Sequence, residues 1–247
     1  MMSAYAGSAT GYTSLAGVSF PAAGVSQTGT MPLQNGWESA QGTYGTGDPS
    51  YFISNGIVNL SGSLERPAGT PADSSSAWAA ATLPPSALPS DNCFGPDTYT
   101  YGGGIWDVGL DNGSGTLYSA NARYTSLAGI SYPVAPTAWQ PLTLVNGSGA
   151  YPCNTGPSYF VSGNVVYLTG VTILPSGFEG EIAVLPPAAR PTHVLFMIAA
   201  NGGSGSAPAD VYVTLMIEPS GDVWIVSPPG GAAYMVNLSG LSFHTGS

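Results

Sequence analysis

Short runs in which apolar and polar residues alternate dominate the chain. Two of them, residues 51–64 and 159–174, each read as two strands around a turn, at Asn55-Gly56 and at Gly163-Asn164. Alternation with a period of two is typical of strands with one buried face, and Asn and Gly tolerate the positive φ of a two-residue turn. The pattern predicts the same β-hairpin at two places, one in each half of the chain.

Three further pairs of segments recur in the same order along the chain. They are Asn35-Gly36 with Asn146-Gly147, residues 82–89 with 184–191, and residues 104–119 with 211–227. The first pair predicts tight turns, and the last predicts hairpins that turn at a Ser-Gly. About five to eight short antiparallel strands in roughly 110 residues are typical of a β-sandwich or a small barrel.

Helix signals are weak. The best helix candidate is SSSAWAAATL at residues 74–83, because it combines serine caps with a run of alanines. The alternative interpretation of this segment is a long loop.

One nine-residue segment occurs three times. It reads YTSLAGVSF at residues 12–20, YTSLAGISY at 124–132 and MVNLSGLSF at 235–243, and successive copies are almost equally spaced. Each copy predicts a terminal strand, and its glycine, Gly17, Gly129 or Gly240, predicts a bulge that resets the register.

The long period of this repeat predicts the domain organisation. A spacing above 100 residues exceeds that of a solenoid and matches one small domain. We therefore expect two tandem antiparallel β-sandwich domains of a jelly-roll-like kind, residues 21–132 and 133–247. A leading segment, residues 1–20, contributes an extra strand. An unpaired strand would be a sticky edge, so we expect Tyr12, Leu15, Val18 and Phe20 to pair with the chain or with a partner during assembly.

Composition narrows the choice of partners. Only 6% of the residues are charged, there is no lysine, and the net charge is -10. The three cations are Arg66, Arg123 and Arg190. Nucleic acid and anionic membranes are disfavoured as partners, because both need a cationic patch. We expect no membrane insertion, since no apolar run is long enough, and the first residues lack the features of a signal peptide.

Cys93 and Cys153 are the only cysteines, one in each unit. They do not occupy equivalent positions in the repeat. Two interpretations stay open: a pair of unbonded, half-buried thiols, or one disulfide that links the two units and requires an oxidising compartment.

The order of these elements resembles the C-terminal domains of bacteriophage tail fibre and minor tail proteins. That family has an NGW turn, a hairpin V-x-L-x-G, an LP-x-x-x-RP segment and a terminal strand L-x-G-I-x-F. The matching positions here are Asn35-Gly36-Trp37, residues 58–62 and 166–170, residues 185–191, and residues 127–132 and 238–243. Two motifs depart from the pattern, with Ser148 in place of Trp and Leu88-Pro89 in place of Arg-Pro. The resemblance implies a virion structural or host-recognition protein, commonly a homotrimer.

Candidate catalytic chemistry is sparse. His193 and His244 have no partner at metal-ligand spacing, so we expect no metal site, no cofactor and no catalytic residue. Glu179 and Glu181 could project from one strand face like a glycosidase pair, but no other part of such a site is identifiable. Asp111 and Asp222 read as turn acids; a weak calcium site there has no EF-hand spacing to support it.

Exposed aromatic rings are the best binding hypothesis. Trp78, Tyr99, Tyr101 and Trp139 fall in predicted loops or beside prolines, where a ring could stack on the face of a sugar or pack within the protein. Trp37, Trp106 and Trp224 lie in or next to predicted strands and are expected in the core.

The sequence therefore predicts a non-enzymatic particle component. The expected role is structural or host-recognising, in a tail fibre, a minor tail protein or a surface decoration. Its partners would be copies of itself, other virion proteins and host surface glycan. The alternative is a secreted bacterial adhesin or carbohydrate-binding module. A polysaccharide-degrading tail enzyme is disfavoured by the thin supply of acid and base residues.

Overall fold

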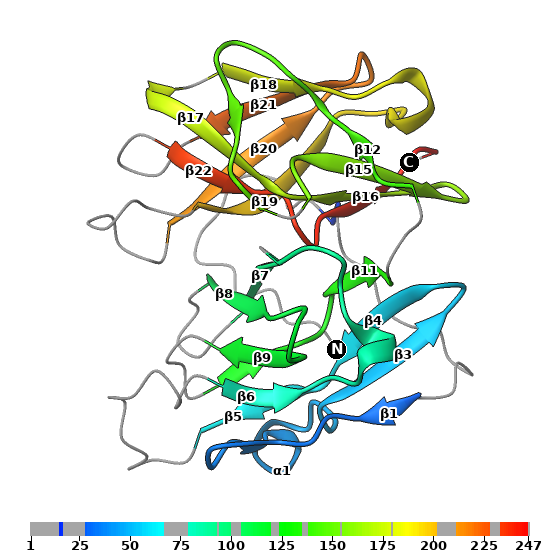
Figure 1. The fold of residues 1–247 in the computed structure, drawn as a ribbon, viewed down its shortest axis with the longest axis vertical. Helices are drawn as coiled ribbons and strands as arrows, with labels where there is room; N and C mark the ends of the chain where they lie inside the picture. Colours follow the sequence, from blue (N-terminus) through cyan, green and yellow to red (C-terminus); the bar gives the residue numbers. More distant parts are fainter. Residues whose placement is uncertain are drawn as a thin grey trace.

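The computed structural model describes residues 15–16, 28–66, 79–92, 94–99, 105–119, 124–134, 138–153, 155–178, 180–201, 211–227 and 233–246. The described elements are mostly short strands, and every recorded strand pair is antiparallel. They form two lobes that are stacked along the long axis of the molecule (Figure 1). The described helical turns are short: α1 (Gln41–Tyr44), η2 (Pro85–Ala87) and η3 (Pro187–Ala189).

Three sheets make up the lower lobe in Figure 1. Their strand orders are β1-β3-β4-β11, β10-β5-β2 and β6-β9-β8-β7. The first sheet contains β1 (Gly29–Thr30), β3 (Ser50–Ser54), β4 (Ile57–Ser61) and β11 (Ser131–Pro133). The second contains β10 (Tyr124–Ser126), β5 (Ser63–Glu65) and β2 (Glu38–Ser39). The third contains β6 (Ala79–Thr82), β9 (Thr116–Ser119), β8 (Ile105–Leu110) and β7 (Asp97–Tyr99).

Two sheets make up the upper lobe. One has the order β12-β15-β16-β23, from β12 (Gln140–Pro141), β15 (Ser158–Ser162), β16 (Val165–Thr169) and β23 (Ser242–His244). The other has eight strands in the order β13-β18-β21-β20-β19-β22-β17-β14. These are β13 (Thr143–Leu144), β18 (Gly180–Val184), β21 (Asp222–Ser227), β20 (Val211–Ile217), β19 (Leu195–Asn201), β22 (Ala233–Asn237), β17 (Val171–Phe178) and β14 (Gly149–Ala150). Its edge strands β13 and β14 follow one another in sequence, so the sheet is nearly closed.

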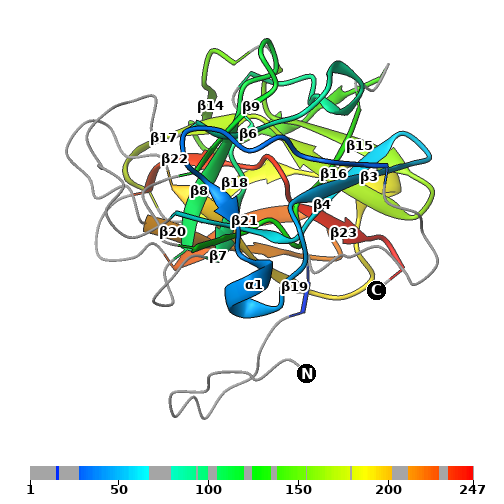
Figure 2. The same cartoon turned by 90° about the horizontal axis from the view of Figure 1, so that it is seen from below.

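The strand orders of the two lobes correspond. In the lower lobe β4 pairs with β3 and β11, and in the upper lobe β16 pairs with β15 and β23. The register also corresponds, since Tyr51 lies opposite Leu60 and Tyr159 lies opposite Leu168. Figures 1 and 2 place the hairpins β3–β4 and β15–β16 on the same side of the molecule.

Each lobe has its own hydrophobic core. The lower cluster is centred on fully buried residues such as Val58, Leu64 and Leu117, and it includes the predicted core residue Trp37. The upper cluster contains Ile182 and Leu215 among others. Alternate residues of the strands supply both clusters, which is the period-two pattern read from the sequence.

The predicted tight turns are confirmed. Asn35, Asn55 and Asn146 have φ values of 51°, 52° and 53°, and each is followed by a glycine with positive φ. Gly163 turns the second hairpin at φ 61°. Asparagine and glycine tolerate this left-handed region, which a two-residue hairpin turn needs.

The predicted terminal strand with a bulge is wrong in its local form. Residues 124–132 contribute two strands to different sheets: β10 pairs with β5, and β11 pairs with β4. The third copy likewise divides into β22 and β23. Gly129 and Gly240, at φ 90° and 82°, lie in the turns where the chain crosses from one sheet to the other.

The helix prediction at residues 74–83 is wrong over its second half. Ala79–Thr82 is strand β6, which pairs with β9. Ala80 and Ala81 are fully buried in the lower core. Non-local pairing and burial outweigh the small intrinsic preference of alanine for helix.

Cys153 is disulfide-bonded. Because the chain holds only two cysteines, Cys93 is the only partner available within the chain. Cys93 itself lies outside the described residues. Of the two interpretations that the sequence left open, the disulfide is the one that agrees with the structure.

Candidate functional site

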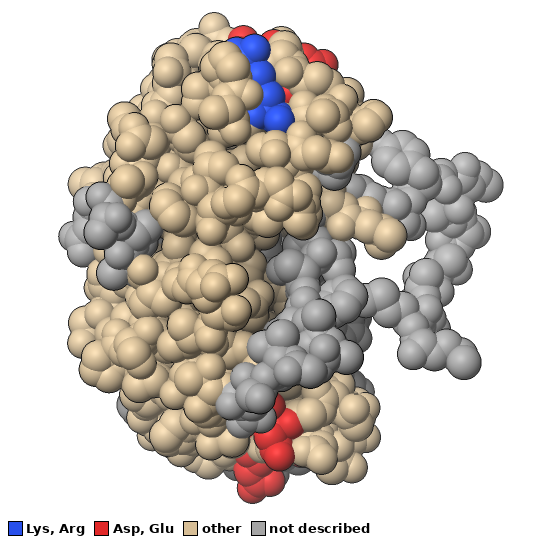
Figure 3. Space-filling model, turned by 90° about the vertical axis from the view of Figure 1, so that its right-hand side faces the viewer, with Lys and Arg blue, Asp and Glu red and all other residues tan. Residues whose placement is uncertain are grey.

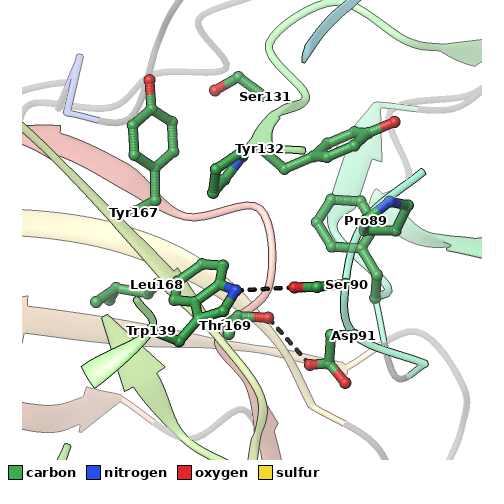
Figure 4. A pocket seen from close by; sticks show the side chains of 11 residues that line it. Pro89, Ser90, Asp91, Ser131, Tyr132, Trp139, Tyr167, Leu168 and Thr169 are labelled. Carbon is green, nitrogen blue, oxygen red and sulfur yellow. Dashed lines mark hydrogen bonds between the residues drawn. The ribbon is translucent and has the colours of Figure 1, made fainter. Parts of the chain in front are cut away.

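The junction between the lobes gathers residues from several elements (Figure 4). The lower lobe contributes the segment after η2 and strand β11, and the upper lobe contributes Trp139 and strand β16. The lining residues are Pro89, Ser90, Asp91, Phe94, Ser131, Tyr132, Pro133, Trp139, Tyr167, Leu168 and Thr169. The open space among them is only about 10 Å³, which is about the minimum for one water molecule. The junction is therefore a packed interface rather than a ligand cavity.

Trp139 joins the two lobes. Its indole Nε1 donates a hydrogen bond of 2.8 Å to Ser90 Oγ, as the dashed line in Figure 4 shows. Its ring meets Phe160 edge-on, with centroids 6.0 Å apart. The side chain is half-buried. A tryptophan with a satisfied N–H and an aromatic neighbour is well suited to hold an interface in place.

Buried polar groups cross the junction beside Trp139. The hydroxyl of Thr169 donates to Asp91 Oδ2 at 3.0 Å and lies 3.3 Å from the hydroxyl of Ser239. Asp91 is 1% exposed. The hydrogen bond from Thr169 to this buried carboxyl group fixes the relative position of the two lobes, because leaving a buried polar group unpaired would cost free energy.

The terminal segments of the two lobes also meet here. Ser131 of β11 and Ser242 of β23 have hydroxyl oxygens 3.5 Å apart, and both residues are buried. Near them, a Cβ added to Gly240 would lie 2.5 Å from Pro96 Cβ. The lower lobe therefore approaches the backbone of the upper lobe so closely that a side chain at this position does not fit.

Tyr132 ties the lower core to the junction. Its hydroxyl donates to the carbonyl of Ala87 at 2.7 Å, and its ring lies 4.6 Å from that of Phe94. Burial raises the pKa of Tyr132 far above its ordinary value, because the ionised form would be desolvated. The residue remains a neutral donor throughout the ordinary pH range.

The other predicted ligand-binding residues are only partly covered by the structure. Trp78 and Tyr101 lie outside the described residues, and Tyr99 is described only in its backbone, as the last residue of β7. Trp106 is likewise described only in its backbone, whereas Trp224 is half-buried on β21 rather than part of a core cluster.

Little of the predicted assembly strand is described. Tyr12, Val18 and Phe20 lie outside the described residues. Leu15 is 72% exposed, and Ala16 packs against the upper hydrophobic cluster. The leading segment thus touches the upper lobe at one described residue.

The candidate acid, base and metal residues do not form a cluster. His193 and His244 are exposed, Glu179 lies outside the described residues, and Glu181 sits on β18 opposite Trp224. Within the described ranges, no three His, Cys, Asp or Glu residues are placed to hold a metal ion. In the same part of the chain, no helix is long and apolar enough to cross a membrane.

A second hollow lies beside the hairpin β8–β9 in the lower lobe. It is an open depression of about 240 Å³ lined by Asn92, Phe94, Gly109, Leu110, Asp111 and Tyr118. Sequence reasoning missed this group, except that it recognised Asp111 as a turn acid. The signal that could have found it is the difference between the two equivalent hairpins, since Gly109 and Met216 occupy matching places in them.

Asp111 follows β8 in sequence and lines this hollow. Its Oδ1 accepts a 2.8 Å hydrogen bond from the N–H of Gly113, and its Oδ2 accepts one of 2.8 Å from the hydroxyl of Ser114. These two bonds hold the pKa of Asp111 below its ordinary value. The carboxylate is therefore ionised at neutral pH and fixed in direction by its own turn.

Comparison with known proteins gives one partial structural likeness. No protein-family model and no curated protein sequence matches the chain. The chain is similar in structure to the receptor binding protein (gp15) of Listeria phage PSA, with 24% sequence identity and a TM-score of 0.36. The match covers 44% of this chain and 66% of that one, so this chain spans slightly less than two thirds of its length. An overlap this loose assigns no function to this chain.

Proposed function

We propose that the chain is a non-enzymatic, host-recognising structural component of a phage-like particle, in its tail fibre, minor tail or surface decoration. The observation that carries this proposal is the recurrence of the tail-protein motifs at matching places in both lobes. The V-x-L-x-G segments form the end of β4 and β16 and the turns that follow them. The LP segments lead into η2 and η3, and the L-x-G segments span the turns before β11 and β23.

The corresponding strand orders support two copies of one unit. We propose that residues 21–132 and 133–247 are tandem β-sandwich domains of a jelly-roll-like kind, after a leading segment of residues 1–20. Separate hydrophobic clusters and matching registers support this division. Each half, expressed alone, should fold with its own cooperative unfolding transition. Two halves that fold only together would refute the division.

Charge and surface composition support an assembled, extracellular role. The face shown in Figure 3 carries few charged side chains, and most of its described surface is uncharged. Several large apolar side chains of the upper lobe are exposed, namely Val194, Ile198, Tyr212 and Val226. Apolar surface of this kind favours contact with another subunit. We propose self-assembly, with a homotrimer as the state that the family resemblance implies. A monomer mass by light scattering at micromolar concentration would contradict it.

The leading segment has a proposed role in assembly. Tyr12, Leu15, Val18 and Phe20 belong to an extra copy of the terminal motif, which neither lobe requires. We expect it to pair with this chain, a neighbouring subunit or another particle protein. Deleting residues 1–20 should leave both lobes folded, as judged by circular dichroism, and impair assembly or attachment. Normal assembly of the deletion variant would refute this role.

The test of the main proposal is the location of the chain. Particles purified from the native source should contain its peptides by mass spectrometry, and an antibody against it should block adsorption to host cells. Peptides found only in the medium or on bacterial surfaces would favour the alternative of a secreted adhesin or carbohydrate-binding module. Host glycan is the proposed external partner. Of the rings predicted from sequence to stack on it, Trp139 is engaged in the junction, and Trp78, Tyr99 and Tyr101 stay predictions.

A further inference from the structure

We propose that the hollow beside Tyr118 binds a single neutral pyranose ring of a host surface glycan. This inference deepens the proposed function, on which it rests, and assigns the sugar contact to residues that sequence reasoning did not select. It rests on one strand position that differs between the two lobes and on the chemistry of the residues around that position.

The hairpins β8–β9 and β20–β21 occupy matching places in their sheets. In the lower lobe Gly109 lies opposite Tyr118, and in the upper lobe Met216 lies opposite Trp224. All four positions face away from the core, because their neighbours along each strand are buried. In the upper lobe Met216 covers the sheet next to the aromatic ring. In the lower lobe the missing side chain leaves the depression of about 240 Å³.

The backbone does not require glycine at position 109. Gly109 is not among the residues with positive φ. A Cβ added there would meet only Tyr118 Cβ, at the ordinary contact distance of 3.7 Å. Glycine inside a strand weakens it and often marks a place where a ligand comes close. We infer that the absence of a side chain at Gly109 keeps the hollow open and that the fold does not require glycine there.

The hollow has the features of a small sugar site. Tyr118 is 38% exposed and supplies an aromatic surface, while Phe94 and Leu110, which are almost fully buried, also line the hollow. The C–H-rich face of a pyranose stacks on such a surface by the same apolar contact that aromatic side chains make. A volume of about 240 Å³ lies below the roughly 300 Å³ at which sites for drug-sized ligands begin. One sugar ring therefore suits it better than a longer ligand.

The polar rim suits sugar hydroxyls. Asp111 accepts hydrogen bonds from the N–H of Gly113 and the hydroxyl of Ser114 in its own turn, and a carboxylate offers about four lone-pair sites in all. Hydrogen bonds from hydroxyl groups to an ionised carboxylate are stronger than bonds between neutral groups. Asn92 is exposed and lines the same hollow, so its polar side chain adds to the polar character of the rim.

The charge of the lining residues favours a neutral sugar over an anionic one. The six lining residues include one acid, Asp111, and no Arg, Lys or His. The whole chain has a net charge of -10. A sialic acid, a uronic acid or a sugar phosphate would meet repulsion and no cationic partner here.

The test is titration of the full-length protein with monosaccharides. The probes are the methyl glycosides of glucose, galactose, mannose and N-acetylglucosamine, with sialic acid as the anionic comparison, followed by saturation-transfer NMR and calorimetry. We expect at least one neutral glycoside to bind at about millimolar Kd, equivalent to about −4 kcal/mol. Sialic acid should bind at least about tenfold more weakly. The inference would be overturned if none of the neutral glycosides showed saturable binding, or if sialic acid bound more tightly than they do.

Three variants locate the binding. Gly109→Met installs the upper-lobe residue and should abolish binding by filling the hollow. Tyr118→Ala and Asp111→Asn should each weaken it by about tenfold or more, as expected for the loss of a stacking ring or of a charged acceptor. Trp224→Ala is the matched control at the equivalent position of the upper lobe and should leave the affinity unchanged. Thermal melting identifies any variant that fails to fold. The folded variants then test whether the hollow is the binding site.

The outcomes separate this inference from the proposed function. A chain found on particles that binds no pyranose refutes the sugar site and leaves the particle role standing. A chain that binds sugar at Tyr118 but is absent from particles refutes the particle role and leaves the site standing. Binding that Gly109→Met, Tyr118→Ala and Asp111→Asn all leave intact would place the sugar elsewhere and refute the assignment.

Discussion

Gly129 and Gly240 occupy the same place in the two lobes but meet different surroundings. Both have positive φ, at 90° and 82°. A Cβ at Gly129 would meet nothing within 4 Å, whereas one at Gly240 would lie 2.5 Å from Pro96 Cβ. Substitution at Gly129 therefore tests the backbone requirement for glycine alone. Substitution at Gly240 tests that requirement together with the steric requirement of the junction.

We predict that Gly240→Ala destabilises the protein more than Gly129→Ala. Both variants suffer the strain of a left-handed alanine, roughly 1–2 kcal/mol. Only Gly240→Ala forces the lobes apart, which should cost a further ~1–3 kcal/mol. Urea denaturation measures both free energies of unfolding. Equal losses in the two variants would show that contact with Pro96 does not constrain the junction.

Tyr132 gives a prediction for the alkaline side of the stability curve. Its folded-state pKa is raised by burial from the ordinary value of 10.0. A neutral group whose pKa is raised on folding contributes stability that is fully present below the unfolded-state pKa, and this contribution is lost as the pH rises above it. We expect the free energy of unfolding to fall above about pH 10, and to fall less steeply in Tyr132→Phe. At neutral pH the variant should lose about 1–3 kcal/mol, because the carbonyl of Ala87 is left without its donor. Identical alkaline slopes in the two proteins would count against this account.

At the scale of single elements, the chain shows why alanine-rich sequence is ambiguous. The segment AAAT fits both a helix and a strand, and periodicity does not distinguish them over four residues. The structure makes it β6, which pairs with β9 and buries Ala80 and Ala81 in the lower core.

This packing predicts a large effect for Ala80→Leu. Ala80 is fully buried in the lower core, so three extra carbon atoms should destabilise the protein by ~1–3 kcal/mol through overpacking. Ala128 lies exposed in the turn between β10 and β11, and Ala128→Leu is the control with a change below roughly 0.5 kcal/mol. Thermal melts of both variants check the expectation. An unchanged melting temperature in Ala80→Leu would mean that the core around β6 is loosely packed.

At the scale of the whole molecule, the lobes are held by the junction and by a covalent bond. The disulfide at Cys153, with Cys93 as its only partner in the chain, closes the loop between these two positions. That loop would contain β11, β12 and the segment that joins the lobes. A bond between these two positions would restrict the unfolded chain and would link the two lobes.

We predict that reduction destabilises the protein by about 4 kcal/mol, the loop-closure entropy for a loop of this length. Denaturant unfolding with and without a reducing agent measures the difference. Cys153→Ser should lose a similar amount and should no longer respond to the reducing agent. A wild-type protein that unfolds identically under both conditions would show that the bond does not contribute to stability.

Sequence by itself determined the tight turns and hairpins of this protein and the correspondence between its halves. The turns at Asn35, Asn55 and Asn146 follow from residues that tolerate positive φ, and the hairpins follow from strict alternation. Both signals act between residues that are close along the chain, so they can be read without knowing the rest of the fold. The same is true of the low charge, which limits the partners irrespective of shape.

The tertiary structure decided where the repeated segments separate and which residues meet. Residues 124–132 read as one strand, yet they divide between two sheets because β5 and β4 offer different edges. The sequence predicts an exposed ring for Trp139. In the structure its contacts with Ser90 of the lower lobe and Phe160 of the upper lobe place it in the junction. Gly109 and Tyr118 line one hollow because the register of β8 and β9 sets them opposite one another. Each of these outcomes depends on contacts between distant parts of the chain, and a single sequence does not reveal which distant parts will pair.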